Sequence, residues 1–272
     1  MHRNIDEVEF TIFDTETTGL EPESGDRVVE IAGIRFKGKE IIATFQTLIN
    51  PHKPISLAAF QVNKITADML DNAPETVEAI PKFLEFSGES CLCSYNAAFD
   101  LEFLKSELKL IGKSLPDNSV VDILRMARRI MPGLERYSLW FVADKLGIKT
   151  QQEHRALSDV ELTLEVFNKL NGLLQAKGIS DFKNFLSLFG IKSGLLNDIN
   201  NQKIAKIQEA ISLGVKLKIR YLAGVDASVS EREVVPKQIK QDNSRSYLVA
   251  YCCLRNEERT FRVDGILHLE II

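Results

Sequence analysis

The first half of the chain begins with a strand-like run of hydrophobic residues that ends in a carboxylate. Residues 8–13 are rich in β-formers and partly alternate, so they predict a strand with Asp14 at its C-terminal end. Two further strands are predicted over 27–36 and 40–48, and the glycine between them at 38 favours a hairpin. The pattern therefore opens with neighbouring strands.

Helix-like spacing of apolar residues follows, interrupted by short buried-type strands. Helices are predicted at 75–86, 97–111, 123–130 and 138–146, and a last one follows His154 and runs to Leu170. Short strands are predicted at 90–95 and 120–121. Strands first, and then alternating strands and helices, indicate an α/β fold with a mixed sheet and flanking helices.

The last third of the chain has a different character. Residues 172–203 are rich in Gly, Lys, Ser and Asn, and predict a connecting segment with a short helix or two. A helix at 204–213 and several short strands then predict a small β-rich domain. We therefore divide the chain into a first domain at 1–174, a connection at 175–203 and a second domain at 204–272.

Composition limits the function classes. Hydrophobic residues make up 44% of the 272 residues and charged residues 26%, as in an ordinary globular protein. The first seven residues lack the apolar core of a signal peptide and no run is long enough to span a bilayer, so the default compartment is the cytoplasm. The net charge of −4 argues against simple coating of nucleic acid. Residues 204–272 hold 11 basic and 9 acidic residues, so the second domain is the more basic one.

The four cysteines stand as two close pairs, Cys91 with Cys93 and Cys252 with Cys253. Neither pair has the two-residue gap that is usual in zinc sites. Packing in the core of strands is therefore the favoured role.

Carboxylates at the ends of predicted elements carry the candidate chemistry. Asp14 and Glu16 are two residues apart, so both side chains project from one face of an extended segment. Asp100 falls in the first turn of a predicted helix, and Asp159 falls early in another. Each of them also has a plain interpretation as a solvated or helix-start carboxylate. Convergent carboxylates are what Mg²⁺ and Mn²⁺ need as ligands for phosphodiester cleavage.

Three motifs in order resemble the DnaQ-like exonucleases of the DEDDh type. They are Phe13-Asp14-Thr15-Glu16-Thr17-Thr18-Gly19-Leu20, Asn96-Ala97-Ala98-Phe99-Asp100 and His154-Arg155-Ala156-Leu157-Ser158-Asp159. The resemblance covers residues 8–170 and implies an RNase H-like fold. It also implies a 3′–5′ exonuclease that hydrolyses phosphodiester bonds with two Mg²⁺ or Mn²⁺ ions.

The resemblance implies roles by position. Asp14, Glu16, Asp100 and Asp159 are similar to the metal-binding carboxylates, and His154 to the general base, a task that suits the ordinary pKa of histidine.

The surroundings of Thr15, Thr17 and Leu20 are similar to the pocket for the terminal nucleotide, and we expect Asn96 nearby. Tyr95 stands where the family often has His, a departure that bears on substrate preference. Asp122 also follows a predicted strand, but the family does not use it as a ligand, and we leave it out of the site.

Residues 206–272 resemble a WYL domain, which implies binding of nucleic acid or of a nucleotide-like ligand. The expected binding residues are Arg220, Tyr221, Arg232, Tyr247, Arg259 and Arg262, the arginines for phosphate and the tyrosines for bases. Core tyrosines and solvated arginines are the plain alternative. Ser246 stands where the family has Trp, and Gly265 where it often has Arg.

The prediction is a nuclease that acts on DNA, single-stranded in preference, with nucleic acid as its partner and roles in repair, proofreading or turnover. An exoribonuclease acting on RNA or short oligonucleotides is one alternative. A non-catalytic regulator is another, although the full set of five site residues speaks against it. A transcription regulator is disfavoured because we find no helix-turn-helix segment.

Overall fold

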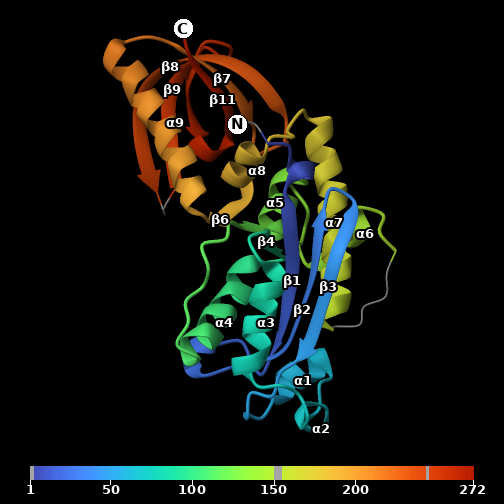
Figure 1. The fold of residues 1–272 in the computed structure, drawn as a ribbon. Coiled ribbons are helices and arrows are strands. Elements are labelled where there is room, and N and C mark those ends of the chain that lie inside the picture. Colours follow the sequence, from blue (N-terminus) through green and yellow to red (C-terminus); the bar gives the residue numbers. More distant parts are fainter. Residues whose placement is uncertain (1–2, 150–154, 243–244) are drawn as a thin grey trace.

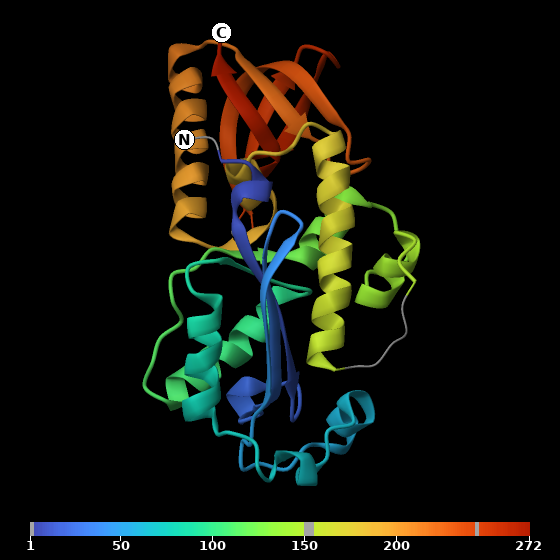
Figure 2. The same ribbon diagram turned by 45° about the vertical axis from the view of Figure 1, so that its right-hand side comes forward.

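The computed structural model describes residues 3–149, 155–242 and 245–272 of the chain. Figure 1 shows a first domain built on one sheet and, at one end of it, a second sheet packed under a long helix. The opposite end of the first domain carries the short helices α1 and α2. These lie far from the second domain in both views (Figures 1 and 2).

The first sheet is mixed, with strand order β3-β2-β1-β4-β5-β6. Its strands are β1 (Glu9–Thr17), β2 (Val28–Lys37), β3 (Glu40–Leu48), β4 (Cys91–Ser94), β5 (Val120–Asp122) and β6 (Gly190–Lys192). The chain enters through the antiparallel meander β1-β2-β3 and then adds β4 parallel to β1. The parallel strands place the residues that follow β4 and β5 beside the second half of β1.

Helices cover both faces of this sheet. They are α1 (Leu57–Asn63), α2 (Ala67–Leu70), α3 (Thr76–Ser87), α4 (Ala97–Leu110), α5 (Ile123–Ile130), α6 (Leu139–Lys145), α7 (Ala156–Ala176) and α8 (Phe182–Phe189). Phe10 and Ile12 of β1 pack with α5, α7 and α8, whereas Phe13 packs with α3 and α4. Two hydrophobic cores, one on each face, therefore hold β1 in the middle of the domain.

The predicted elements agree with the structure in most places, and the differences lie where the sequence lacks a clear period. α5 and β3 have the predicted bounds, and the other helices of the first domain shift by a residue or two or extend further, as α7 does to Ala176. The helices α1 and α2 were not predicted; the chain there mixes breaks with short apolar runs.

The connecting segment at 175–203 differs most from its expectation. α8 buries Phe185, Leu186 and Phe189 in the core of the first domain, and β6 pairs with β5 at the edge of the first sheet. The helix expected at 204–213 is instead α9 (Gly194–Leu213), which begins at Ser193 because that side chain accepts a hydrogen bond from the Leu196 amide. The segment therefore packs as part of both domains and is not a free linker between them.

The second domain is an antiparallel sheet in the order β10-β9-β8-β7-β11. Its strands are β7 (Leu217–Leu222), β8 (Val229–Asp242), β9 (Arg245–Cys252), β10 (Glu257–Arg262) and β11 (Ile266–Ile271). α9 covers the sheet and buries Ile207 and Ala210 against it. Leu222 and Leu267 leave this core and join the core of the first domain, so the two domains share apolar packing.

Polar contacts also join the domains. Arg220 of β7 donates to the carbonyl oxygens of Lys177 and Gly178 at 2.9 and 3.2 Å. Arg129 of α5 pairs with Asp264 at 3.1 Å. The second domain is therefore held against α5, α7 and α8, at the end of the sheet where β1 begins (Figure 2).

Candidate active site

Three carboxylates from two elements converge in the second half of β1. Asp14 and Glu16 point to the same face of the strand, and Asp159 lies in the first turn of α7, which packs on that face. One ligand oxygen from each lies within 4.8 Å of the other two. All three side chains are partly exposed, as access by an ion and a substrate requires.

Asp100 joins the group from α4, and its carboxylate is firmly held. Its Oδ1 accepts hydrogen bonds from the Thr15 amide at 3.0 Å and the Thr15 hydroxyl at 2.8 Å. The Ser94 hydroxyl donates to its Oδ2. Since Thr15 lies between Asp14 and Glu16, these bonds tie the start of α4 to β1 beside the other carboxylates.

The electrostatics of the four carboxylates favour a cation among them. Burial, together with the charges of Asp159, Glu30 and Asp100, raises the pKa of Glu16 to about 8. Burial and then Asp100, Glu16 and Asp159 raise the pKa of Asp14 well above its usual range. Burial likewise raises the pKa of Asp100 to about 6, against the hydrogen bonds from Ser94 and Thr15. Oxygen ligands that repel one another in this way fit hard divalent cations such as Mg²⁺ and Mn²⁺.

A buried ion pair fixes the start of α7. Arg155 donates to both carboxylate oxygens of Glu30 at 3.0 and 2.7 Å, and the Ala156 amide donates to the same carboxylate at 3.3 Å. Glu30 is fully buried on β2, where it stands opposite Glu16. This pair positions Asp159, and sequence reasoning missed it because the partners are far apart in the chain. The predicted general base, His154, lies outside the described residues.

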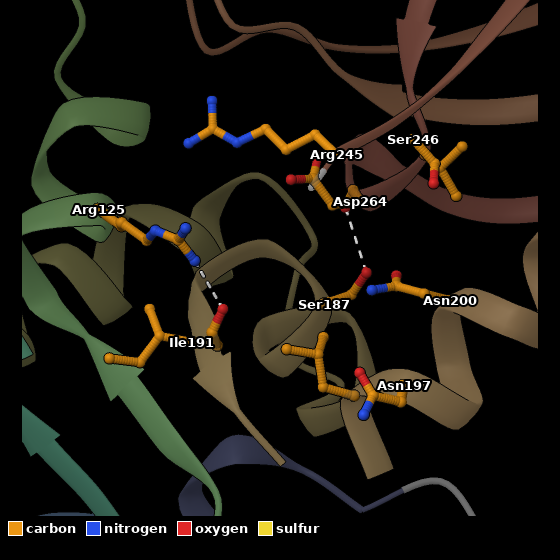
Figure 3. Close-up of a pocket in the computed structure, with 11 residues that line it drawn as sticks. Arg125, Ser187, Ile191, Asn197, Asn200, Arg245, Ser246 and Asp264 are labelled. Atoms are coloured by element: carbon orange, nitrogen blue, oxygen red, sulfur yellow. Dashed lines mark hydrogen bonds between the residues drawn. The ribbon is translucent and has the colours of Figure 1, made fainter. Parts of the chain in front are cut away.

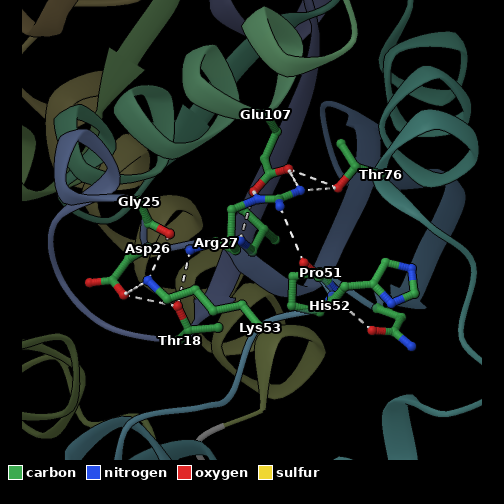
Figure 4. Close-up of polar contacts among 11 residues, drawn as sticks. Thr18, Gly25, Asp26, Arg27, Pro51, His52, Lys53, Thr76 and Glu107 are labelled. Atoms are coloured by element: carbon green, nitrogen blue, oxygen red, sulfur yellow. Dashed lines mark hydrogen bonds and ion pairs between the residues drawn. The ribbon is translucent and has the colours of Figure 1, made fainter.

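The loop after β1 is shaped by Asp26. Its carboxylate accepts hydrogen bonds from the Thr18 hydroxyl at 3.0 Å and the Lys53 ammonium at 2.8 Å (Figure 4). It also accepts one from the Glu21 amide at 3.1 Å. A Cβ at Gly19 would lie 2.2 Å from this carboxylate, so a larger residue there would displace Asp26 from its hydrogen bonds. The loop of the first motif is therefore folded back on itself.

A second ion pair anchors α4 to the sheet. Arg27 donates to both oxygens of Glu107 at 2.8 and 2.9 Å, and Thr76 donates to the same carboxylate at 2.8 Å (Figure 4). Glu107 is buried and also accepts from the Val28 amide at 3.0 Å. The helix that carries Asp100 is thus held at both ends.

An apolar cavity of about 320 Å³ lies beside the carboxylates. It is lined by Thr15, Glu16, Thr17, Gly19, Leu20, Ser56, Ala58, Ala59, Val62, Asn63 and Phe99. The structure thus brings the predicted Thr15, Thr17 and Leu20 to one pocket. The sequence did not reveal the wall from α1, because that short helix has no motif. Leu20 and Val62 are 78% and 50% exposed, so the pocket presents bare apolar side chains to a ligand.

Asn96 and Asp122 lie elsewhere. Asn96 caps α4 with a left-handed backbone, φ 72°, and its amide donates to Asp122 at 3.2 Å. Asp122 also caps α5 by accepting from the Leu124 amide at 2.9 Å, which explains its place outside the carboxylate group. Neither residue lines the apolar cavity; both line a groove that faces the second domain.

The six residues predicted in the second domain do not converge on one site. Arg220 joins the domains, the Tyr221 ring packs edge-on against Phe261, and Arg232 donates to Ser230. Arg259 is exposed and pairs with Glu257, while the Tyr247 side chain is half-buried on β9. Arg262 alone of the six lines the groove, and it shares Asp264 with Arg129.

The structure explains why a glycine stands at position 265, which the sequence alone could not. A Cβ at this position would lie 2.6 Å from Nη2 of Arg129 and 2.8 Å from the Tyr221 ring. The guanidinium of α5 therefore occupies the space that a side chain at 265 would need.

Other expectations concern cysteines and membranes. Cys91, Cys93 and Cys252 are buried in strands, Cys253 is half-buried, and all four are free thiols.

Among the described residues no helix has the length and apolar character needed to cross a bilayer.

The arrangement defines a class, a mixed α/β sheet with convergent carboxylates on its central strand, and the comparisons with known proteins agree with it. Residues 11–167 match the exonuclease family, and residues 202–271 match the WYL domain. The chain is 38% identical over 200 residues to a DNA polymerase III subunit epsilon-like protein of Rhodobacter capsulatus, covering 72% of this chain and 28% of that protein. It is 37% identical over 182 residues to the PolC-type DNA polymerase III of Caldanaerobacter subterraneus, covering 67% of this chain and 13% of that protein.

A solved structure of exonuclease X in complex with 5′ overhanging duplex DNA is similar in fold, with a TM-score of 0.52 and 25% identity. The match covers 70% of this chain and 98% of that chain. The chain belongs to the exonuclease family, with the RNase H-like fold and a C-terminal WYL domain. It spans between about a tenth and a third of the length of these curated relatives.

Proposed function

We propose that the protein is a divalent-metal-dependent 3′–5′ exonuclease that removes nucleotides from the 3′ end of DNA, single-stranded in preference. The observation that carries the proposal is the grouping of Asp14, Glu16 and Asp159 within 4.8 Å, with Asp100 tied beside them through Thr15. Membership in the exonuclease family supports the same reaction. Repair, proofreading or turnover of nucleic acid are the processes that such an enzyme serves.

The four carboxylates would hold two Mg²⁺ or Mn²⁺ ions. Such ions supply positive charge to the scissile phosphate and make water more acidic. The chain's own groups do the rest. Thr15 and Ser94 orient Asp100, and the pair of Arg155 with Glu30 sets the position of α7 and hence of Asp159. His154 is proposed as the base that accepts the proton of the attacking water.

The apolar cavity supports a terminal nucleotide at the site. Leu20 and Val62 present apolar surface on which a base can stack, and Glu16 lies at the edge of the same cavity. An apolar pocket that ends in carboxylates fits a nucleotide whose base is buried and whose phosphate meets the metal ions. Base contacts of this kind carry no sequence preference, as an exonuclease requires.

The test uses single-stranded DNA and RNA of the same sequence, each labelled at the 3′ or the 5′ end, with Mg²⁺, Mn²⁺ or EDTA. We expect metal-dependent release of nucleotides from the 3′ end of DNA. Asp14→Asn should lower kcat/KM by about a thousandfold, since charge stabilisation by metal is worth several kcal/mol. Asp68→Asn, an exposed carboxylate on α2, is the matched control and should keep full activity.

Each other outcome has a definite meaning. Faster release from RNA would make the protein an exoribonuclease with the same site. Release from the 5′ end, or activity that survives both EDTA and Asp14→Asn, would contradict the proposal. Strand binding without hydrolysis of any substrate would favour a non-catalytic binding protein.

A further inference from the structure

A groove lies between α5 and the second domain, and its walls do not include the four carboxylates of the candidate active site. Two cavities of about 340 and 360 Å³ share Arg125 and Arg245 in their walls and are therefore neighbours; we call the two together the groove. Figure 3 shows the first cavity, with Arg125 on one wall and Arg245, Ser246 and Asp264 on the wall from the second domain. The second cavity extends from there to Asn96, the residue that caps α4.

Positive charge predominates in this groove. Its cations are Arg125, Arg128 and Arg129 of α5, Arg245 of β9 and Arg262 of β10. Lys203 of α9 adjoins it and donates to the Ser187 hydroxyl in its wall at 2.8 Å. The carboxylates in the walls are Asp122, which caps α5 and α4, and Asp264, which Arg129 and Arg262 share.

Arg129 shows that this charge is not fully matched. Its side chain is 7% exposed, and Nη1 donates to Asp264 at 3.1 Å. Its Nε and Nη2 have no hydrogen-bond acceptor in the part of the chain that the structure describes. Buried guanidinium nitrogens are normally satisfied, so the charge of Arg129 is only partly compensated at the wall of the groove.

The titration behaviour of the neighbouring cations agrees. Burial, opposed by the attraction of Asp264 and aided by the charge of Arg129, lowers the pKa of Lys203 to about 8. Burial also lowers the pKa of Arg125, with Arg245 and Arg262 acting in the same direction. An anion in the groove would offset this crowding of positive charge.

We propose that this groove binds the sugar–phosphate backbone of the nucleic-acid strand behind the 3′ end that is hydrolysed. The proposal rests on the proposed function, because the strand is the substrate of that site. The groove ends at Asn96, the N-cap of α4, and the first turn of the same helix carries Asp100. Guanidinium groups match phosphate oxygens, and a basic groove without base-reading motifs binds any sequence.

This assigns a role to α5 together with the second domain. Arg125 and Arg128 come from the exonuclease domain, while Arg245 and Arg262 come from the WYL domain. The strand would therefore bridge the two. Short substrates would reach the carboxylates alone, and longer ones would gain affinity as soon as their phosphates reach the groove.

The experiment compares Arg125→Gln/Arg245→Gln with the control Arg136→Gln/Arg255→Gln, which removes the same charge from exposed sites outside the groove. Arg245→Gln alone is included because Arg125 also bonds the Gly190 carbonyl at 2.7 Å. Thermal melting checks that each variant is folded. The substrates are single-stranded DNAs from two to about 20 nucleotides long and the p-nitrophenyl ester of thymidine 5′-phosphate.

For the wild type we expect KM to fall with length and kcat to stay constant. In the groove variant KM for the long strand should rise about tenfold, and the slope of log KM against log salt should fall by about 1 to 2. Hydrolysis of the p-nitrophenyl ester should not change. A groove variant whose KM equals that of the wild type at every strand length, with hydrolysis intact, would overturn the proposal.

Failure of the proposed function gives a different pattern. If the wild type hydrolyses neither substrate, that function falls, and fluorescence anisotropy of a labelled strand in EDTA then decides the groove. Weaker binding by the groove variant alone supports it, and equal binding by all variants overturns it. If inorganic phosphate raises Tm only when Arg125 and Arg245 are intact, but KM is the same at all lengths, the groove holds a small phosphorylated ligand and the strand proposal is wrong.

Discussion

The chain holds two clusters of like charge that differ in how they are encoded. The acidic cluster at β1 comes from three short motifs, each of them visible in the sequence. The basic groove comes from single residues on α5, α9, β9 and β10 that no motif connects. Both lack full compensation within the described chain. A cluster of this kind is costly unless a ligand of opposite charge completes it.

The acidic cluster and the basic groove also differ in how firmly their surroundings are fixed. Around the carboxylates, buried pairs such as Arg155 with Glu30 fix the elements before any ligand arrives. In the groove, the one carboxylate that two arginines share is Asp264, and the walls belong to two domains. The acidic site is therefore preorganised, whereas the groove depends on how the domains pack.

The largest expected effect is on the support of the acidic site. Arg155→Met leaves the fully buried Glu30 uncompensated beside Glu16. Breaking one side of a buried ion pair costs about 3 kcal/mol, which lowers Tm by about 10 °C in a chain of this size. Thermal melting of the apo protein measures it, and the exposed Arg136→Gln should change Tm by little.

The double variant Arg155→Met/Glu30→Met sharpens this prediction. Because it leaves no orphaned charge, it should recover a part of the lost stability. A double variant less stable than Arg155→Met alone would mean that packing of the two side chains, rather than their charges, supports α7.

The next effect is on the walls of the groove. Gly265→Ala places a Cβ 2.6 Å from Arg129 and 2.8 Å from the Tyr221 ring, so the Arg129 guanidinium or the ring must move from its packed position. We expect a loss of about 2 kcal/mol in the free energy of unfolding. Urea denaturation followed by tryptophan fluorescence measures it.

Gly172→Ala is the control for this change. Gly172 lies inside α7 with open space around it, so alanine should stabilise the protein by up to about 1 kcal/mol. Equal effects of the two alanines would show that the contact between Gly265 and Arg129 is not tight.

A smaller effect links pH and metal at the acidic site. Folding raises the pKa of Glu16 to about 8 and that of Asp100 to about 6. The folded state therefore binds protons more tightly, so stability is greatest at low pH and falls as pH rises through 8. Mg²⁺ at about ten times its Kd should restore about 1.4 kcal/mol at high pH.

The rise in Tm with Mg²⁺ should be larger at pH 8.5 than at pH 5.5, since at the lower pH the ion must displace protons. Asp14→Asn should raise the Tm of the apo protein and abolish most of the response to Mg²⁺. A response that is the same in Asp14→Asn and wild type would place the metal elsewhere.

The smallest expected effect concerns Lys203 at the groove. Its pKa is lowered to about 8 by burial, so the unfolded state binds the proton more tightly and the wild type gains stability between pH 8 and its usual value of 10.5. The free energy of unfolding of Lys203→Met should therefore equal that of the wild type at pH 7 or exceed it by about 0.5 kcal/mol, and this difference should shrink towards pH 10. Melting curves across this pH range measure it. A difference that grows with pH would contradict the buried charge.

Much of the architecture could be predicted from periodicity. The bounds of α5 at 123–130 and of β3 at 40–48 agree with the prediction, and α5 buries a regular face with Ile123, Met126, Ala127 and Ile130. The helix α1 and the edge strand β6 could not be predicted, since their residues are ordered by contacts with other segments. α9 begins ten residues earlier than expected for the same reason, because α8 packs against its first turns.

The sequence by itself determined the kinds of residue and their order. Three motifs indicated the family and its carboxylates, because ligand chemistry restricts the ligand positions to oxygen donors. They are Phe13 to Leu20, Asn96 to Asp100 and the last motif up to Asp159. Only the tertiary structure decided which groups meet. It pairs Arg155 with Glu30, and it places α1 in the wall of the apolar pocket. Asn96, which we expected near that pocket, lines a different cavity. The tertiary structure also placed Arg129 in the space above Gly265, because contacts between residues far apart in the chain depend on packing that no local pattern records.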